Sequence, residues 1–400
     1  MAAYTSSPVP SSLTSFQRWA EHDKPEFPIS PSHQQGVIPQ TPFEFPLSLQ
    51  GPITLQLNPA EVVEVEQAVK HFLGLGLDGD KVARNTFPLP ALGARLEDCA
   101  ASVHKGTGVA IIRGLTPGQY SAEDNTIIFL GLASHIGGQR GVQNSKGAMI
   151  IHIYESDSWT VPREKRHGIH TNSSLPFHND MGCEILAIHI RNCAALGGGT
   201  YVTSAAAVYN AMMKTDPWAV HTMAKHNWPV QVSRQGYSSF VLAPLIGFQS
   251  GNLVLAVDPA RIGPHPSDRD GRVPDLLPAQ REALILLQQI ATEHRVRLPT
   301  RQGDMVFINN WGVLHARDSY QDDANSIRHL VRLWLRNEQL AWDIPDSMKA
   351  LWDASFGARA MKITNRQYPA APLPEYMEPK FSSGSAAFVV EESDEDNECL

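Results

Sequence analysis

The chain has 400 residues, of which 42% are hydrophobic and 18% charged, a composition typical of a soluble globular protein with room for one large domain or two smaller ones. The formal net charge is −8, but residues 391–400 hold six acidic residues and no basic one, which leaves only −2 on the rest. That balance argues against binding of nucleic acid through a basic face. No apolar run is long enough to cross a bilayer, and the N-terminus has no basic-then-apolar signal pattern, so we expect a cytoplasmic protein that contacts no membrane. The four cysteines lack CxxC spacing and indicate neither a disulfide framework nor a zinc knuckle.

Composition also divides the chain into three parts. Residues 1–50 are rich in Pro and Ser with little periodicity, so we expect an extended or partly disordered arm. Residues 51–375 contain all the predicted helices and strands and are expected to form a single domain. Residues 376–400 end in the acidic run and are expected to be a solvated, disordered tail.

Four stretches predict helices. The first extends from about Pro59 to Leu73, where Asn58 can cap the helix, Pro59 suits its first turn, and apolar residues recur at helical spacing. The other three are predicted at about residues 121–135, where Ser121 is the cap, and at about residues 204–214 and 279–294.

Short apolar runs between these helices predict strands at about residues 108–113, 149–154, 185–191, 201–203, 240–242, 253–257, 304–309 and 327–337. Many short strands with few long helices, and no strict alternation of strand and helix, favour a mainly β fold. We therefore predict an antiparallel barrel or jelly-roll core flanked by helices.

A His-x-Asp pair at His178 and Asp180 is the first candidate metal-binding feature. Such a pair is weak alone, because 16 His and 41 acidic residues give about 1.6 pairs by chance and the chain has one. Residues two apart on a strand project to the same side, so both could face one metal ion. His315 follows the predicted strand 304–309 and could lie at the mouth of a barrel. Two imidazoles and one carboxylate can hold Fe(II) on one face and leave the opposite face open for chemistry.

Two arginines form the second candidate feature. Arg328 and Arg332 are four apart in a run that alternates as a strand, so both should face the same side, together with Trp334. Two arginines on an inner strand face are costly without anions. A dicarboxylate co-substrate would give at least one of them a bidentate partner. The alternative is an internal salt bridge to Asp or Glu.

Together these residues resemble the taurine dioxygenase family of Fe(II)/2-oxoglutarate-dependent oxygenases, whose clavaminate-synthase-like branch is well represented in fungi. The resemblance lies between about Gly108 and Asn337 and rests on the motifs His178-x-Asp180, Gly198-Gly199-Thr200, Asn310-x4-His315-Ala316-Arg317 and Arg328-x3-Arg332. It implies a double-stranded β-helix, that is, a jelly-roll core.

The resemblance also implies roles for single residues. His178, Asp180 and His315 would bind the iron, and Thr200 and Arg328 would hold the distal carboxylate of 2-oxoglutarate. Arg332 corresponds to the arginine that meets the anionic group of the substrate in the taurine enzyme. Clavaminate synthase has Glu in the metal triad, so Asp180 matches the taurine side of the family.

His170 and Asn172 lie just upstream of the metal motif and are the histidine and asparagine that we most expect to contact the substrate. For these two, as for His152, His167 and His189, packing in the core or at the surface is the alternative.

The function expected from these features is that of an Fe(II)- and 2-oxoglutarate-dependent dioxygenase that consumes O2. It would couple oxidative decarboxylation of 2-oxoglutarate to C–H oxidation of a small anionic or zwitterionic molecule, an amino acid or a secondary-metabolite intermediate. Hydroxylation, desaturation and ring closure all remain open as outcomes. Two other classes are considered: a jelly-roll binding protein with a vestigial metal site, and a zinc hydrolase that uses the same three ligands. The zinc hydrolase has no use for Thr200 and Arg328. The oligomeric state is left open, a homodimer included.

Overall fold

The structure is a computed structural model that describes residues 43, 53–144, 146–156, 160, 162, 166, 168–234, 237–264 and 273–372. Apart from Phe43, the predicted N-terminal arm lies outside the described residues, as do the acidic tail and His167. The backbone of Phe43 exchanges two hydrogen bonds with the side-chain amide of Asn210, and its ring stacks on that of Phe248 at 5.2 Å. Among the described residues, none of the helices has the length and apolar character needed to cross a membrane.

All four predicted helices are confirmed: α1 (Pro59–Gly74), α3 (Ala122–Ile136), α4 (Ala205–Thr215) and α6 (Pro278–Glu293). At the start of α1, the side chains of Asn58 and Glu61 each accept a hydrogen bond from the backbone N–H of the other, at 3.0 and 2.8 Å. This reciprocal capping box satisfies two amides that would otherwise lack partners.

The sequence analysis missed the helix α2 (Leu92–Lys105) and three shorter ones, α5 (Pro217–Met223), α7 (Lys349–Phe356) and α8 (Ala358–Met361). Ala91, at the N-cap of α2, has no side chain that can cap. Instead, the carboxylate of Glu64 on α1 accepts from the backbone N–H of Ala91 at 2.7 Å and of Leu92 at 3.2 Å. Because the cap comes from another helix, the local sequence around α2 has no start signal.

The larger of two main sheets, here called the major sheet, has the strand order β1-β2-β14-β6-β17-β3, with β4 also paired to β17. Only the β1–β2 pair is parallel. Its strands are β1 (Ile53–Gln56), β2 (Val109–Arg113), β3 (Gln139–Arg140), β4 (Ile150–Ile153), β6 (Ile185–Asn192), β14 (Met305–Asn309) and β17 (His329–Arg336).

The minor sheet is antiparallel, with the order β13-β8-β15-β5. Its strands are β5 (Leu175–His178), β8 (Thr200–Ser204), β13 (Val296–Arg297) and β15 (Val313–Arg317). Three two-stranded ribbons complete the described strands: β7 (Leu196–Gly197) with β16 (Tyr320–Gln321), β9 (Trp228–Arg234) with β10 (Tyr237–Ala243), and β11 (Ile246–Gln249) with β12 (Asn252–Leu255).

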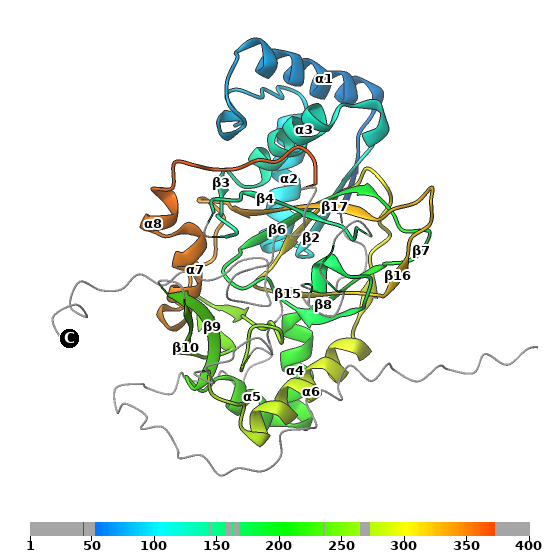
Figure 1. The fold of residues 1–400 in the computed structure, drawn as a ribbon. Coiled ribbons are helices and arrows are strands. Elements are labelled where there is room, and N and C mark those ends of the chain that lie inside the picture. The colour runs from blue at the N-terminus through cyan, green and yellow to red at the C-terminus, as the bar shows by residue number, and fades with distance from the viewer. Residues whose placement is uncertain are drawn as a thin grey trace, which may run out of the picture. The chain divides into compact units, whose positions relative to one another are not determined.

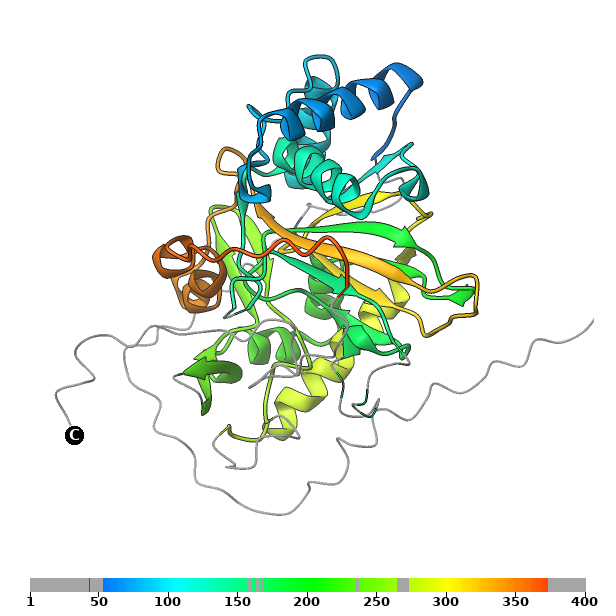
Figure 2. The same ribbon diagram turned by 45° about the horizontal axis from the view of Figure 1, so that its top comes forward.

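The two faces of the major sheet bury different side chains. On β17, Val331, Leu333 and Leu335 pack among residues of α1, α2 and α3, whereas Leu330 and Trp334 belong to the core shared with the minor sheet. This alternation confirms the strand predicted at 327–337. The helices α1 to α3 lie on one side of the major sheet, and α4 and α6 lie beside the minor sheet (Figures 1 and 2). The predicted mainly β jelly-roll core flanked by helices is confirmed.

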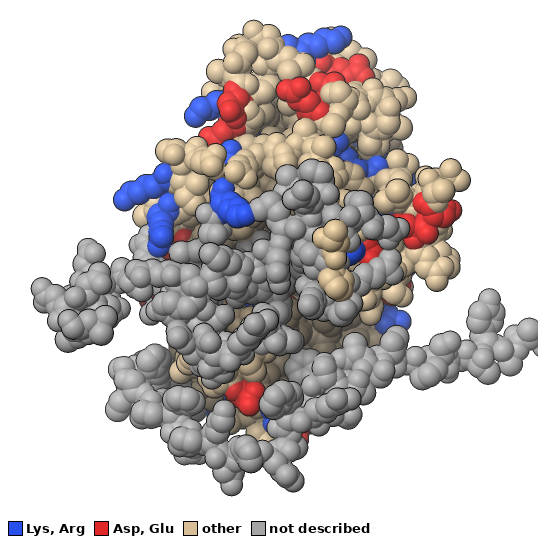
Figure 3. Space-filling view, viewed as in Figure 1, with Lys and Arg blue, Asp and Glu red and all other residues tan. Residues whose placement is uncertain are grey.

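Charges are mixed on the face shown in Figure 3, where described acidic and basic side chains are interspersed over the helical layer. This distribution agrees with the nearly balanced charge of the chain before its last ten residues.

Candidate metal and co-substrate site

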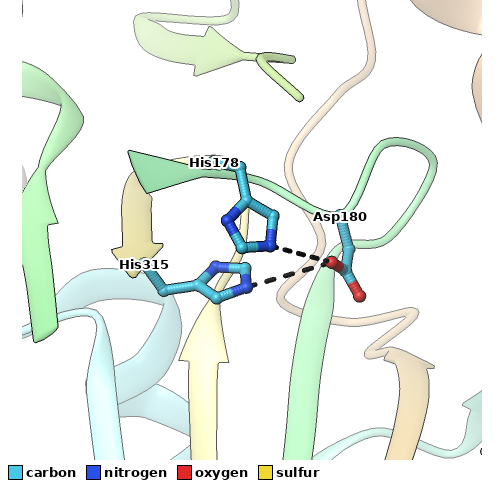
Figure 4. A group of neighbouring side chains, drawn as sticks. All are labelled: His178, Asp180 and His315. Atoms are coloured by element: carbon cyan, nitrogen blue, oxygen red, sulfur yellow. Dashed lines mark ion pairs between the residues drawn. The ribbon is translucent and has the colours of Figure 1, made fainter. Parts of the chain in front are cut away.

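His178, Asp180 and His315 converge between the two sheets. His178 is the last residue of β5 and is the register partner of His315 on β15, so the two rings lie side by side with centroids 4.1 Å apart. The Nε2 atom of each histidine lies 3.9 Å from Oδ1 of Asp180. Figure 4 shows both rings directed at the same carboxylate oxygen. The three ligand atoms lie within 4.8 Å of one another.

One local expectation about this group was wrong. Asp180 is not on a strand with His178, because β5 ends at His178 and Asp180 lies in the following loop. His315 follows the predicted strand, β14, but it lies in the middle of a further strand, β15, that was not predicted. The shared position of the three residues therefore arises from pairing between strands and from the loop, not from alternation along one strand.

Two buried asparagines hold this loop. The side chain of Asn310 accepts from the Asp180 N–H at 2.9 Å and donates to the carbonyls of Asp180 and Cys183, both at 2.7 Å. Asn179 donates to the Asn310 carbonyl at 2.6 Å and accepts from the Val257 N–H at 3.0 Å. These bonds fix the backbone on both sides of Asp180, so its carboxylate is held in one direction.

The second oxygen of Asp180 faces the major sheet. Oδ2 accepts hydrogen bonds from Arg332 Nη1 and Trp334 Nε1, both at 2.8 Å, which confirms that these two residues share one face of β17. Burial alone would raise the pKa of Asp180, but the positive charge of Arg332, aided by the hydrogen bond from Trp334, holds the pKa well below its usual range. The carboxylate is therefore ionised at neutral pH, with Oδ1 directed at the imidazoles.

The Nε2 atoms of both imidazoles face the same point. Nδ1 of His178 donates to the Pro176 carbonyl at 2.8 Å, so the neutral form of this ring has its lone pair on Nε2. Burial lowers the pKa of His315 to about 3, so that ring is neutral at pH 7. A separation of 3.9 Å is too long for a hydrogen bond. Because metal–ligand bonds are about 2 Å long, ligand atoms of one ion are at most about 4 Å apart, and both Nε2 atoms are within that limit of Oδ1. One ionised carboxylate and two neutral imidazoles are the donor set that Fe(II) takes in oxygenases.

Arg332 is positioned by more than the carboxylate. Its Nε donates to Gln143 Oε1 at 2.8 Å, and its guanidinium lies over the Trp334 ring at 5.1 Å. The ion pair of Arg332 with Asp180 is the internal salt bridge that the sequence analysis gave as its alternative. The predicted contact of Arg332 with substrate stays a prediction.

Arg328 and Thr200 come from opposite sheets. Arg328 immediately precedes β17, is 4% exposed, and places its guanidinium over the Tyr320 ring at 5.1 Å. Gly198 makes room for it: a Cβ at this position would lie 3.1 Å from Arg328 Nε and 3.2 Å from Tyr320 Cβ. The φ of Gly198 is also +69°, so both space and backbone favour glycine there. Thr200 is the first residue of β8, two positions further on.

His170 and Asn172 lie in the segment that leads into β5. Nδ1 of His170 donates to the Tyr154 carbonyl at 3.2 Å. Burial, together with the positive charges of Arg332, Arg317 and Arg166, lowers the pKa of His170 to about 4. The carbonyl of Asn172 accepts from the Tyr320 N–H at 3.0 Å. Their contact with substrate stays a prediction.

Other polar residues of this region were given no role from the sequence, although Arg317 stands in one of the motifs: Gln143, Asn179, Arg261, Arg317 and Tyr320. Arg317 had a usable signal, because it lies two residues after His315 and strand periodicity places both side chains on one face. Arg261 had none, because it lies in a loop, where it forms an ion pair with Asp258 at 3.3 Å.

Comparison with known proteins identifies the family of this chain. The family model of the taurine catabolism dioxygenase TauD, TfdA family matches residues 75–334. The taurine hydroxylase-like protein SAT17 of Stachybotrys chartarum is 33% identical over 309 residues, which cover 75% of this chain and 79% of that protein. The FR-33289 synthase of Streptomyces rubellomurinus is 24% identical over 297 residues, covering 71% and 85% of the two chains.

Solved structures show the same fold. A complex of asparagine oxygenase with Fe(II), 2S,3S-3-hydroxyasparagine and succinate has a TM-score of 0.56 at 14% identity and covers 85% of this chain and 99% of its own. The non-heme iron oxygenase OrfP, in complex with Fe and alpha-ketoglutaric acid, has a TM-score of 0.52 at 14% identity, covering 71% and 94%. With the match over residues 75–334, these findings show that the chain belongs to the TauD/TfdA family and is a non-heme dioxygenase that uses Fe(II), 2-oxoglutarate and O2.

Proposed function

We propose that His178, Asp180 and His315 are the iron ligands of this dioxygenase, and that Thr200 and Arg328 hold the distal carboxylate of 2-oxoglutarate. We propose further that Arg332, His170 and Asn172 receive a small anionic or zwitterionic substrate, an amino acid or a secondary-metabolite intermediate. When bound, Fe(II) with 2-oxoglutarate and O2 supplies oxidative decarboxylation, which gives succinate and CO2 and is coupled to oxidation of a substrate C–H bond.

One observation carries the ligand assignment. Both Nε2 atoms face Oδ1 of Asp180 at 3.9 Å, while Arg332 and Trp334 occupy Oδ2 at 2.8 Å. Oδ1 of Asp180 would thus bind the ion together with the histidines, whereas Oδ2 is hydrogen-bonded to Arg332 and Trp334 of β17. The remaining task of the protein is to orient the reactants and to exclude side reactions.

The charge around His170 supports an anionic substrate. Three arginines, Arg332, Arg317 and Arg166, all act on the pKa of this ring in the same direction, so the potential there is positive. In addition, Asp180 is the ion-pair partner of Arg332 and a proposed iron ligand, so one negative charge would serve two cations. A carboxylate on the substrate would offset the excess and take a bidentate hydrogen bond from a guanidinium.

The ligand assignment is tested with purified protein, Fe(II) and 2-oxoglutarate, by measuring succinate release with a panel of amino acids and related acids. We expect release with the right substrate and none from His178→Ala. Iron binding undiminished in the His178→Ala/His315→Ala double variant would refute the assignment. Turnover that persists without 2-oxoglutarate would instead point to the zinc hydrolase considered from the sequence.

The substrate class is tested on the wild-type enzyme. Once a substrate is found, its carboxylate is replaced by the neutral amide. We expect KM to rise by about 10-fold or more, because a hydrogen bond to a charged group is lost. An equal KM for acid and amide would remove the anionic requirement while leaving the iron site intact.

A further inference from the structure

Arg317 lies on the inner face of the minor sheet, beside the proposed co-substrate residues. It is two residues after His315 on β15, so both side chains point to the same face. Its register partner on β8 is Thr200, and residues directly opposite on neighbouring strands have adjacent side chains. Arg317 is 6% exposed, so its guanidinium is inside the protein.

One end of the Arg317 guanidinium is fully occupied. Its Nη2 donates to the carbonyls of Gly168 at 3.2 Å, Thr171 at 2.9 Å and Ser173. These carbonyls belong to residues 168–173, the segment that contains His170 and Asn172 and leads into β5. Arg317 is therefore an anchor for the backbone on the proposed substrate side of the site.

The other end of the guanidinium has no hydrogen-bond partner. Nε and Nη1 of Arg317 are buried and unbonded, as are Nη1 of Arg328 and Oη of Tyr320. The guanidinium groups of Arg317 and Arg328 lie 5.2 and 5.1 Å from the centroid of the same Tyr320 ring. Four polar atoms thus remain unbonded around one ring, and each costs free energy unless a ligand satisfies it.

Neither guanidinium in this corner has a direct ion-pair partner. Among the residues that the structure describes, no carboxylate oxygen lies within ion-pair distance, 4.0 Å, of either guanidinium. Two buried like charges without a close counterion are costly, so an anion between them would stabilise the pair.

We propose that Arg317 is a second arginine of the 2-oxoglutarate pocket, which binds the distal carboxylate together with Arg328 and links it to residues 168–173. The proposal rests on the assignment of Thr200 and Arg328 to the co-substrate. The Nε–Nη1 edge of Arg317 has the fork geometry that binds a carboxylate through two parallel hydrogen bonds. Arg317 comes from the minor sheet and Arg328 from the start of β17, so one carboxylate would join the two sheets.

The link to residues 168–173 has a consequence for the order of binding. When the carboxylate orients the Nε–Nη1 edge, the same rigid, planar group holds its Nη2 against the three carbonyls. Binding of 2-oxoglutarate should therefore stabilise the segment that carries His170 and Asn172 before the substrate arrives. The alternative is that Arg317 only anchors the segment and makes no contact with 2-oxoglutarate.

The test compares two co-substrates that differ only in the distal group. 2-Oxovalerate has the same five-carbon chain as 2-oxoglutarate, with a methyl group in place of the distal carboxylate. Each is titrated anaerobically into the Fe(II)-loaded enzyme, and binding is followed by the absorption band of the iron–oxo-acid chelate. We expect Arg317→Gln to raise the Kd of 2-oxoglutarate by about 10–100-fold and to change that of 2-oxovalerate by less than about 3-fold.

Two variants control this measurement. Arg297→Gln removes an exposed arginine from β13, the edge strand of the same sheet, and should leave both Kd values unchanged. Arg317→Lys keeps the charge but loses the fork, so it should restore part of the preference for 2-oxoglutarate. Equal weakening of both ligands in Arg317→Gln would mean that Arg317 is only a backbone anchor, and would overturn the proposal. An Arg328→Gln variant that still prefers 2-oxoglutarate as strongly as wild type would instead refute the assignment of Arg328.

The link itself is tested on the wild-type holoenzyme, which avoids any folding defect of a variant. Hydrogen–deuterium exchange is measured in residues 168–173 with each co-substrate bound. We expect slower exchange with 2-oxoglutarate than with 2-oxovalerate. Equal exchange with the two ligands would overturn the coupling between the distal carboxylate and this segment.

Discussion

Two groups of histidines lie on opposite faces of the major sheet. The inner group, His178 and His315, faces Asp180 between the two sheets. The outer group consists of His152, His189 and His329. His152 and His189 are register partners of Val331, whose side chain packs among the helices α1 to α3. Both groups are rich in potential metal ligands.

The outer group has an arginine where the inner group has an acid. His152 donates through Nε2 to the Pro369 carbonyl and accepts through Nδ1 from His329, both at 2.8 Å. Burial and the charge of Arg191 lower the pKa of all three rings, that of His329 to about 3. These rings are therefore neutral at pH 7, and in the described part of the chain they form no metal-binding group with a carboxylate. The difference indicates that the ionised carboxylate, rather than the number of histidines, distinguishes the proposed metal site from the outer group.

Removal of that carboxylate is the strongest test of the comparison. We expect Asp180→Asn to weaken Fe(II) binding by about 10³-fold, because a unit charge about 4 Å from another is worth about 4 kcal/mol at the effective dielectric of a protein. Succinate release should fall to background. Anaerobic calorimetric titration with Fe(II) measures the first effect. Circular dichroism must confirm folding, since Arg332 loses its buried partner, a change that costs about 3–5 kcal/mol. An Fe(II) affinity of Asp180→Asn within tenfold of wild type would show that the carboxylate does not distinguish the two groups.

Matched removal of one histidine from each group gives the next largest effect. His178→Ala should weaken Fe(II) binding by about 100-fold or more, beyond the range for loss of an outer partner of a ligand. His152→Ala, from the outer group, should change it by less than about twofold, because the major sheet separates this ring from the ion. Both are measured by the same titration. A comparable loss in the two variants would show that the groups are not independent.

Local sequence signals account for much of what could be predicted. The capping box of Asn58 and Glu61, the alternation along β17 and the glycines before Thr200 are all encoded within a few neighbouring residues. Contacts between distant segments account for what was missed. The helix α2 takes its cap from Glu64 on another helix, and no motif around Leu92 records that contact.

The candidate site shows the same division. His178 and Asp180 were predicted from their His-x-Asp spacing, and His315 from its place after a predicted strand and from the family resemblance. The reason offered for the first pair was wrong, because β5 ends before Asp180. The position of Asp180 depends on Asn179 and Asn310, whose partners are backbone groups up to 134 residues away. The strand β15 was not predicted, because its inner face carries His315 and Arg317 instead of apolar residues. A buried strand is predicted from a continuous apolar run, and this segment has none.

A smaller effect should follow from loss of one hydrogen bond to the inner carboxylate. Trp334→Phe keeps the aromatic packing of β17 but removes the donor to Asp180 Oδ2. We expect Fe(II) binding to weaken by about tenfold, the lower end for an outer partner of a metal ligand. Trp352→Phe is the matched control, because this buried tryptophan stacks on Phe356 and is not among the hydrogen-bond donors to Asp180 Oδ2. Unchanged Fe(II) affinity in Trp334→Phe would show that Arg332 alone orients the carboxylate.

The outer group should affect the pH dependence of the free energy of unfolding and leave Fe(II) binding unchanged. The pKa of His189 lies well below its ordinary value because of burial, so the unfolded chain binds more protons as the pH falls below about 6.5. The stabilisation is complete above that pH and is lost progressively below it, by up to about 1.4 kcal/mol per pH unit for this residue. His189→Leu should therefore flatten the decline in the free energy of unfolding between pH 6 and pH 4, measured by urea denaturation.

Neither ring nitrogen of His189 has a hydrogen-bond partner, so the free energy of unfolding at pH 7 should not fall in His189→Leu. His294→Leu serves as the exposed control. A decline as steep in His189→Leu as in wild type would mean that His189 does not remain neutral, and the distinction between the two groups would then rest on Asp180 alone.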